Sequence, residues 1–197
     1  MTLARGTDRI ESARLTLRRI DPGDFDFFTD LNADPEVARY LPHGRPRSTE
    51  ESLAWLRSVR RDYEELELGQ LAVLRNSDGA LIGRCGLSDL VVEARAGVAG
   101  VPRGWYRRED APSEGEVVFE RELGYTFHRS SWGQGYASEA VRRVFEYVRD
   151  VLRVPRVVSL IHPENVRSLR LVQRFGVRRE GSVAVLSRLY DQFVWPI

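Results

Sequence analysis

One stretch constrains the fold of this chain more than any other: residues 122–148, ELGYTFHRSSWGQGYASEAVRRVFEYV. Hydrophobic and polar residues alternate from Leu123 to Phe127, which predicts a half-buried strand. Gly133 and Gly135 then mark a turn, where a backbone without Cβ can adopt positive φ or approach a ligand closely. From Ala137 the hydrophobic residues recur with helical spacing, which predicts an amphipathic helix.

A strand that enters a helix through a glycine turn directs several backbone N–H groups, and the positive end of the helix dipole, toward one point. Such turns bind anions, most often phosphate, although they also occur in α/β proteins that bind no ligand. This turn is not a Walker A motif, because no Gly-Lys-Ser/Thr ends it. It is not the dinucleotide fingerprint either, because Ser138 stands where that motif needs glycine.

Length and composition predict one soluble, cytoplasmic domain over residues 1–197. The net charge of +1 gives no electrostatic signature of a nucleic-acid partner. The N-terminus lacks an apolar signal segment and no apolar run reaches transmembrane length, so we expect no membrane partner. Cys85 is the single cysteine and the three histidines lack ligand spacing, so we expect no disulfide and no metal site.

The rest of the chain alternates between strand and helix patterns. Helix starts are predicted at Asp21-Pro22, at Asp34-Pro35, at the capping box that begins with Ser48, and at Asn165. Further strands are expected over residues 15–20, 70–75, 80–86, 156–161, 177–186 and 192–197. Residues 92–116 break this pattern with glycines and prolines, and they indicate an irregular insertion.

Five segments together resemble the GCN5-related N-acetyltransferase (GNAT) superfamily. They are IESARLTLR (10–18), LIGRCGL (81–87), ELGY (122–125), WGQGYASEAV (132–141) and HPENVRSLRLVQRFGV (162–177). They occur in the family's order along most of the chain, and the nearest resemblance is to the RimJ/RimL-like ribosomal-protein N-terminal acetyltransferases. The resemblance implies an α/β (α+β) fold with a central mixed, mostly antiparallel sheet. It also implies a parallel, splayed strand pair at the cofactor site and helices on both faces.

The resemblance further implies that acetyl-CoA is the cofactor. The family's pattern at the pyrophosphate turn is Arg/Gln-x-x-Gly-x-Gly/Ala, and here Trp132 replaces the leading residue. The departure matters little, because backbone groups do most of the binding. The edge of strand 125–129 would pair with the pantetheine arm, which Asn165 would also contact. The expected cofactor-binding residues are Tyr125, Phe127, His128, Arg129, Trp132, Gly133, Gln134, Gly135, Tyr136, Ala137, Asn165, Ser168 and Arg174.

Two residues are expected to be catalytic. An aliphatic ammonium has a pKa near ~10, so a base must deprotonate the acceptor, and Glu122 occupies the family position often given that role. The alternative for Glu122 is a strand-end residue that faces solvent or pairs with an arginine. Many relatives protonate the leaving thiolate with a tyrosine, but Val172 stands there and cannot do so. Ser168 is the predicted substitute, with plain helix capping and protonation by solvent as alternatives.

The predicted activity is therefore acetyl transfer from acetyl-CoA to a primary amine by direct attack in a ternary complex. The acceptor stays open among a protein N-terminal α-amine, a polyamine, an amino acid and an aminoglycoside. The alternative is a non-catalytic module of the same fold that binds CoA or acyl-CoA. For residues 92–116 the alternatives are a substrate-side lid, an oligomer contact such as that of a homodimer, and a surface loop.

Overall fold

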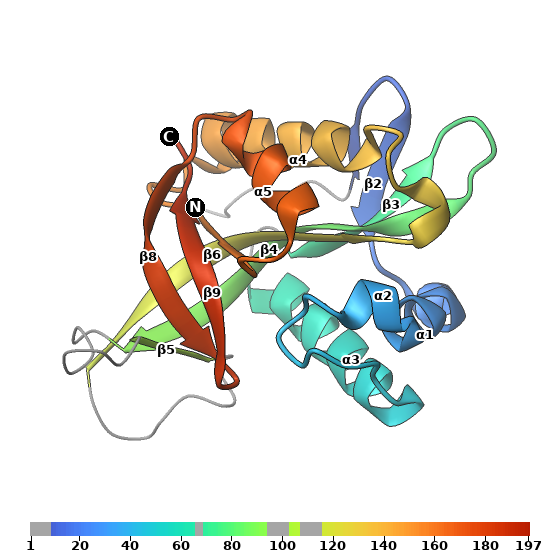
Figure 1. The fold of residues 1–197 in the computed structure, drawn as a ribbon. Coiled ribbons are helices and arrows are strands. Elements are labelled where there is room, and N and C mark those ends of the chain that lie inside the picture. Colours follow the sequence, from blue (N-terminus) through green and yellow to red (C-terminus); the bar gives the residue numbers. More distant parts are fainter. Residues whose placement is uncertain (1–8, 66–68, 94–102, 107–115) are drawn as a thin grey trace. The chain divides into compact units, whose positions relative to one another are not determined.

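The structure is a computed structural model that describes residues 9–65, 69–93, 103–106 and 116–197 (Figure 1). It has the predicted mixed α/β architecture, and the chain divides into two compact units. The first unit contains residues 1–39, 44–87 and 124–153, and the second contains residues 40–43, 88–123 and 154–197. Two long strands, β4 (Leu81–Glu93) and β6 (Val117–Phe127), contribute residues to both units.

The sheet of the first unit begins with successive antiparallel strands. They are β1 (Arg9–Glu11), β2 (Leu15–Arg19), β3 (Gln70–Arg75) and the first half of β4. The start of β4 also lies against the end of β6, where the His128 N–H donates to the Ile82 carbonyl at 2.9 Å. The approach is close, because a Cβ at Gly83 would lie 2.4 Å from the Thr126 carbonyl oxygen. Glycine at position 83 therefore lets the two backbones meet.

The helices of the first unit begin where the sequence predicts. Asp21 caps the short 3-10 turn η1 (Pro22–Asp24) that leads into α1 (Phe25–Ala33), and Asp34 caps α2 (Pro35–Ala38). Ser48 and Glu51 form the predicted capping box before α3 (Thr49–Glu65), since each side chain accepts a hydrogen bond from the other's backbone N–H.

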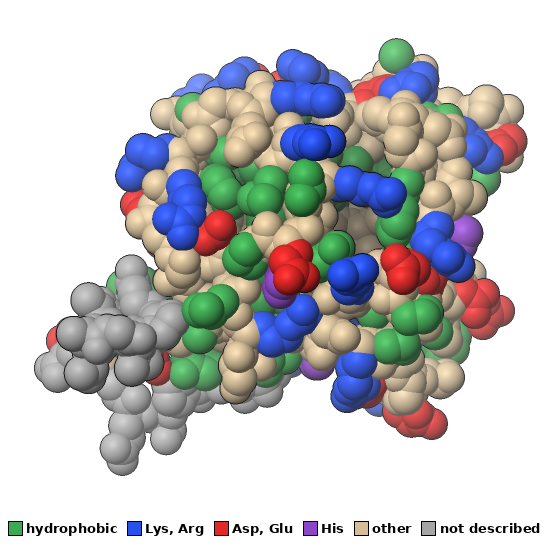
Figure 2. All heavy atoms as spheres, in the orientation of Figure 1, with side chains coloured by type: hydrophobic (Ala, Val, Ile, Leu, Met, Phe, Trp, Pro, Cys, Tyr) green, Lys and Arg blue, Asp and Glu red, His purple; other side chains and the backbone are tan. Residues whose placement is uncertain are grey.

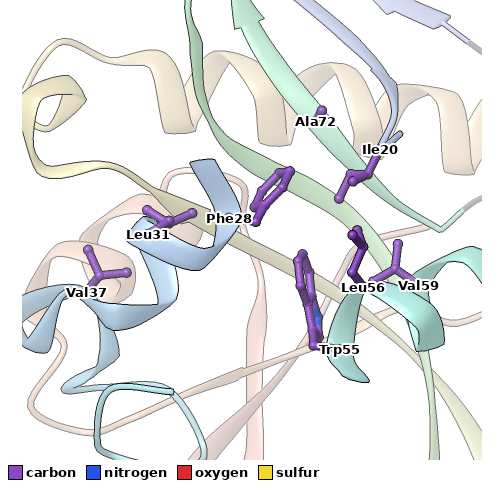
Figure 3. Close-up of a cluster of buried hydrophobic side chains, with 8 residues drawn as sticks. All are labelled: Ile20, Phe28, Leu31, Val37, Trp55, Leu56, Val59 and Ala72. Atoms are coloured by element: carbon purple, nitrogen blue, oxygen red, sulfur yellow. The ribbon is translucent and has the colours of Figure 1, made fainter. Parts of the chain in front are cut away.

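The helices α1, α2 and α3 cover one face of this sheet (Figures 1 and 3). Their contact is a cluster of buried side chains that includes Phe28, Trp55 and Leu56, with Ile20 and Ala72 on the sheet side. Leu17 and Val73 are paired in register and point to the opposite face, because side chains alternate along a strand. Helix α4 (Tyr136–Tyr147) covers that second face with its hydrophobic stripe of Ala140, Val141, Val144 and Phe145.

The sheet of the second unit has the order β4-β5-β8-β9-β7-β6. Besides β4 and β6 it contains β5 (Arg103–Tyr106), β7 (Val158–Ile161), β8 (Arg178–Val185) and β9 (Arg188–Val194). The pairs β5–β8 and β6–β7 are parallel, and the pairs β4–β5, β8–β9 and β7–β9 are antiparallel. Helix α5 (Val166–Gln173) follows β7. The mixed sheet predicted from the sequence is thus confirmed.

The expected irregular insertion needs correction. Its first residues, Val92 and Glu93, continue strand β4, and residues 103–106 form strand β5. Trp105 from β5 is 2% exposed and packs with Val92, Val158, Val183 and Tyr190 in the core of the second unit. Part of the segment is therefore built into a sheet, and the prediction was wrong because the parallel partner of β5 lies about eighty residues downstream in β8. Residues 94–102 and 107–115 lie outside the described residues, so the lid and the oligomer contact stay predictions.

Candidate active site

The turn between Trp132 and Tyr136 has the backbone geometry that its glycines predict. Gly133 and Gly135 adopt φ of +75° and +81°, conformations that residues with a Cβ rarely take. Gly135 is the N-cap of α4, and its carbonyl accepts a hydrogen bond from the Glu139 N–H at 3.1 Å. No side chain at the N-cap occupies the first N–H groups of the helix. The first N–H groups of a helix have no partner within it. The turn thus presents backbone donors to an anion at the positive end of the helix dipole.

Arg14 lies over this turn and is held there by Glu139, from the first turn of α4. The Arg14 Nε donates to Glu139 Oε2 at 2.7 Å, and the Arg14 backbone N–H donates to Oε1 at 2.9 Å. The Ser12 hydroxyl also donates to Oε1, at 2.8 Å. Burial alone raises the pKa of Glu139, but the hydrogen bonds from Ser12 and Arg14 outweigh it, so the pKa lies below its ordinary value.

The Arg14 guanidinium also fixes the backbone of the turn. Its Nη1 donates to the Gln134 carbonyl at 3.1 Å, and its Cζ lies 4.7 Å from the centroid of the Tyr136 ring. On the other side, the Gln134 side chain donates to the Ser130 carbonyl at 2.7 Å. Gln134 is therefore held through both its backbone carbonyl and its side chain, and Arg14 brings a positive charge to the turn.

The end of β6 and the residues after it are anchored in the first unit. The Trp132 indole donates to the Phe127 carbonyl at 2.8 Å. His128 caps the 3-10 turn η3 (Arg129–Ser131), with its Nδ1 2.8 Å from the Ser130 hydroxyl. Arg129 pairs with Asp34, the N-cap of α2, at 2.6 Å. Arg129 thus has a structural function, because its side chain pairs with the N-cap of α2. Its contact with the cofactor stays a prediction.

Glu122 lies in the second unit, where β6 meets β7 and Glu122 is in register with Val158. The next carbonyl of β6, that of Leu123, accepts a hydrogen bond from the buried Ser159 hydroxyl at 2.6 Å. That hydroxyl in turn accepts from the Trp195 indole N–H at 3.0 Å. The Ser159 hydroxyl, itself bonded to Trp195, thus gives the Leu123 carbonyl a hydrogen bond in place of one from a neighbouring strand.

Asn165 is the N-cap of α5, and its Oδ1 accepts a hydrogen bond from the Ser168 N–H at 3.2 Å. The predicted capping role of Asn165 is confirmed, and it is compatible with a further contact to a ligand through the side-chain amide. Ser168 is half-buried, whereas Arg174 at the C-cap is exposed. Val172 is fully buried, and its aliphatic side chain has no proton to donate.

The predicted site residues thus fall into two groups. Residues 125–137 belong to the first unit, and Glu122, Asn165, Ser168 and Arg174 belong to the second. Cys85 is buried, and burial raises the pKa of its thiol, so it is not a nucleophile. Within the described ranges, no cluster of three or more His, Cys, Asp or Glu side chains is arranged to hold a metal ion. No helix in those ranges is long and apolar enough to cross a membrane.

Sequence reasoning missed residues in both groups: Ser12, Arg14 and Glu139 at the turn of the first unit, and Ser159 and Trp195 next to Leu123 in the second. Glu139 carries a weak signal, because an acidic residue in the first turn of a helix is favourable but would repel a bound phosphate unless it is neutralised. That conflict points to a cationic partner, and Arg14 is that partner.

Comparison with known proteins identifies the family. The sequence model of the acetyltransferase (GNAT) domain matches residues 14–178. This chain belongs to the GNAT acetyltransferase family. It is 24% identical to the uncharacterized N-acetyltransferase p20 of Bacillus licheniformis, over 88% of this chain and 84% of that protein. It is 26% identical to the uncharacterized N-acetyltransferase YnaD of Bacillus subtilis, over 87% of this chain and 84% of that protein.

Solved structures show the same GNAT fold. An acetyltransferase from Agrobacterium tumefaciens superposes with a TM-score of 0.73 and 20% identity, covering 100% of this chain and 99% of that one. RimL, a ribosomal L7/L12 alpha-N-protein acetyltransferase, superposes with a TM-score of 0.69 and 14% identity, covering 96% and 94%. The chain is thus an acetyltransferase of the GNAT family, and these solved structures, both less than 25% identical to it, show that it shares their fold.

Proposed function

We propose that this GNAT enzyme transfers an acetyl group from acetyl-CoA to a primary amine. The observation that carries the proposal is the exposed turn of Gly133 and Gly135 at the start of α4, with the Arg14 guanidinium fixed over it. Left-handed glycines, helix N–H groups and a cation together suit the pyrophosphate of CoA. Bound acetyl-CoA would supply a thioester as the acetyl donor.

The chain's own residues would bind and align that donor. The N–H groups at the start of α4 would donate to the pyrophosphate, and the strand edge over residues 125–129 would pair with the amides of the pantetheine arm. Asn165 would contact the same arm through its side-chain amide. Alignment of two bound reactants is itself a large part of catalysis, because it replaces a bimolecular encounter by a reaction within one complex.

Glu122 would act as the general base. Near pH 7 only about one aliphatic amine in a thousand is unprotonated, so the carboxylate must take a proton from the acceptor, directly or through water. Ser168 would return a proton to the leaving thiolate. Since a thiol has a pKa near ~8.5, solvent can also supply that proton, and we expect Ser168 to matter less than Glu122.

The acceptor we favour is the α-amine of a protein N-terminus. The support is the fold shared with RimL, which is described as an alpha-N-protein acetyltransferase of ribosomal L7/L12. A small-molecule amine is the second candidate, because the names of the two Bacillus relatives state no acceptor.

Steady-state acetylation of a panel of peptides and small amines tests the proposal. The chain contains no lysine, because all 30 of its Lys and Arg residues are arginines, so every blue side chain in Figure 2 is an arginine. Acetyl-lysine formed on a protein acceptor can therefore be followed without background from lysine side chains of the enzyme. We expect turnover of at least one acceptor, and a loss of about 100-fold or more in kcat in Glu122→Gln. Tight CoA binding without turnover of any amine would favour the alternative, a non-catalytic CoA-binding module.

A further inference from the structure

We propose that His162, with the rings of Tyr40 and Tyr190, forms a binding site for the ammonium group of the acceptor on the same sheet face as Glu122. All four residues lie in the second unit. The inference rests on the proposed acetyl transfer and names the side chains that would recognise the acceptor before it is deprotonated.

The three rings form one cluster. The His162 ring lies 5.5 Å from the Tyr40 ring and 5.6 Å from the Tyr190 ring, with the latter pair nearly perpendicular at 84°. Tyr190 is 2% exposed and belongs to the core, whereas His162 and Tyr40 are half-buried. The buried ring thus supports two rings that are accessible to a ligand.

The Tyr40 segment is fastened to β9 by two hydrogen bonds to its backbone. The Tyr190 hydroxyl donates to the Tyr40 carbonyl at 3.3 Å, and Arg188 Nη1 donates to the Leu41 carbonyl at 2.6 Å. These contacts join residues about 150 positions apart, so the cluster is built by tertiary structure and not by a local turn. Arg188 is a cation near the cluster, and its guanidinium is directed to this carbonyl.

The sheet register brings Glu122 to the same face. Glu122 is in register with Val158, and paired residues of neighbouring strands project to the same side. Val158 and Tyr190 belong to the same buried cluster, and Leu160, two residues further along β7, packs against that cluster. His162 follows at the next position of that alternation, just beyond the end of β7. Burial is the main cause that raises the pKa of Tyr190; the positive charge of Arg188 acts to lower it, and the Glu122 carboxylate adds a smaller increase.

These groups favour a cation. The His162 Nδ1 accepts a hydrogen bond from the Glu164 N–H at 3.2 Å, so the chain's own backbone engages this ring nitrogen. Neutral aromatic rings attract an ammonium through their π faces, and a nearby carboxylate adds to that attraction. The aromatic rings and the Glu122 carboxylate therefore match a positively charged primary amine.

Binding can be tested without turnover. Tetramethylammonium is a cation that cannot be acetylated, and the chain has three histidines, so ring resonances are assignable with His43→Gln and His128→Gln variants. In an NMR titration up to roughly 0.1 M of this probe, we expect the His162 ring signals to shift and those of His43 and His128 to stay. An unchanged His162 signal would overturn the proposal, whether or not the enzyme acetylates any amine.

Kinetics test the same site on an active acceptor. We expect His162→Ala to raise the KM for the amine by about 3- to 30-fold and to leave the KM for acetyl-CoA within about twofold. His162→Gln serves as a second variant if His162→Ala folds poorly. Tyr190→Phe removes the hydroxyl that donates to the Tyr40 carbonyl, and Tyr147→Phe, in α4 of the first unit, is its matched control. A variant that loses thermal stability or kcat without any change in the KM for the amine would show a packing function and refute the binding site. Failure of every amine to react would instead refute the proposed function, and the NMR titration would still decide the binding site.

Discussion

Arg14 and Glu139 are 125 residues apart in sequence, yet Arg14 Nε lies 2.7 Å from Glu139 Oε2. The pair connects the loop between β1 and β2 to the first turn of α4. It neutralises a carboxylate that would otherwise repel an anion at the helix N-terminus, and it directs the Arg14 guanidinium to the Gln134 carbonyl. The turn proposed to bind the pyrophosphate is therefore held by a side chain from the beginning of the chain.

Removal of Arg14 should weaken cofactor binding more than it slows the reaction. We expect Arg14→Ala to raise the KM for acetyl-CoA by about 5- to 20-fold with little change in kcat, because it removes a charge and a constraint on the turn. Arg14→Lys should give an intermediate effect, since lysine keeps the positive charge but lacks the planar guanidinium that donates to both Glu139 and Gln134. Arg149→Ala is the matched control, because Arg149 forms an exposed ion pair with Asp150 beyond the other end of α4. An equal increase in KM in the control would contradict the prediction.

Glu139 should make the stability of the protein depend on pH in the acid range. Its pKa is lower in the folded protein than its ordinary value, so the carboxylate contributes stability above the pKa of the unfolded chain. That contribution disappears as the pH falls through the folded pKa. We expect Glu139→Gln to lower the free energy of unfolding by about 1 kcal/mol at pH 7 and by less at pH 3. Urea denaturation at both pH values measures the difference, and a constant loss at both would refute it.

The turn glycines offer a matched test of local strain against function. Gly133 and Gly79 adopt φ of +75° and +70°, and at both positions a Cβ would meet no atom within 4 Å. Alanine at either position should therefore cost a similar amount of stability, about 1–2 kcal/mol. Only Gly133→Ala should also raise the KM for acetyl-CoA, because Gly79 lies in the hairpin turn between β3 and β4. Thermal melts and kinetics on both variants decide this, and an unchanged KM in Gly133→Ala would count against the pyrophosphate turn.

Ser159 should be important for both stability and rate. Ser159→Ala would leave the Leu123 carbonyl and the Trp195 indole N–H buried without their bonds, at a cost of about 1–3 kcal/mol. Because Leu123 follows Glu122 directly, we also expect kcat to fall by more than the KM for acetyl-CoA changes. Ser182→Ala, at an exposed serine of β8, is the control and should change neither quantity appreciably. A fully active Ser159→Ala enzyme would show that Glu122 is positioned by other contacts.

The sequence predicted those parts of the fold that depend on neighbouring residues. The caps at Asp21, Asp34, Ser48 and Asn165 and the positive φ of the turn glycines follow from residues within a few positions of each other. These local predictions are confirmed. The functions assigned to Glu122, Ser168 and the cofactor-binding residues stay predictions, as do the single domain, the cytoplasmic location and the homodimer.

Contacts between distant segments could not be read from spacing. Strand β5 looked irregular because its stability depends on β8, and the hydrophobic periodicity of four residues is too short to show a strand. The pairing of Arg14 with Glu139 and the bridge from Ser159 to Trp195 likewise join segments that no periodic pattern relates. Burial and hydrogen bonding select these partners, and both exist only in the folded chain.

The division of the chain has a practical consequence for the choice of fragments. The chain changes unit after residues 39, 43, 87, 123 and 153, so neither unit is a continuous stretch of sequence. A fragment that starts at residue 1 and ends at residue 39, 43, 87 or 123 would leave both units incomplete, and one that ends at residue 153 would contain the first unit together with an incomplete second unit. Cofactor binding and acceptor binding will therefore have to be separated by point substitutions in the whole polypeptide, because no truncation isolates either unit.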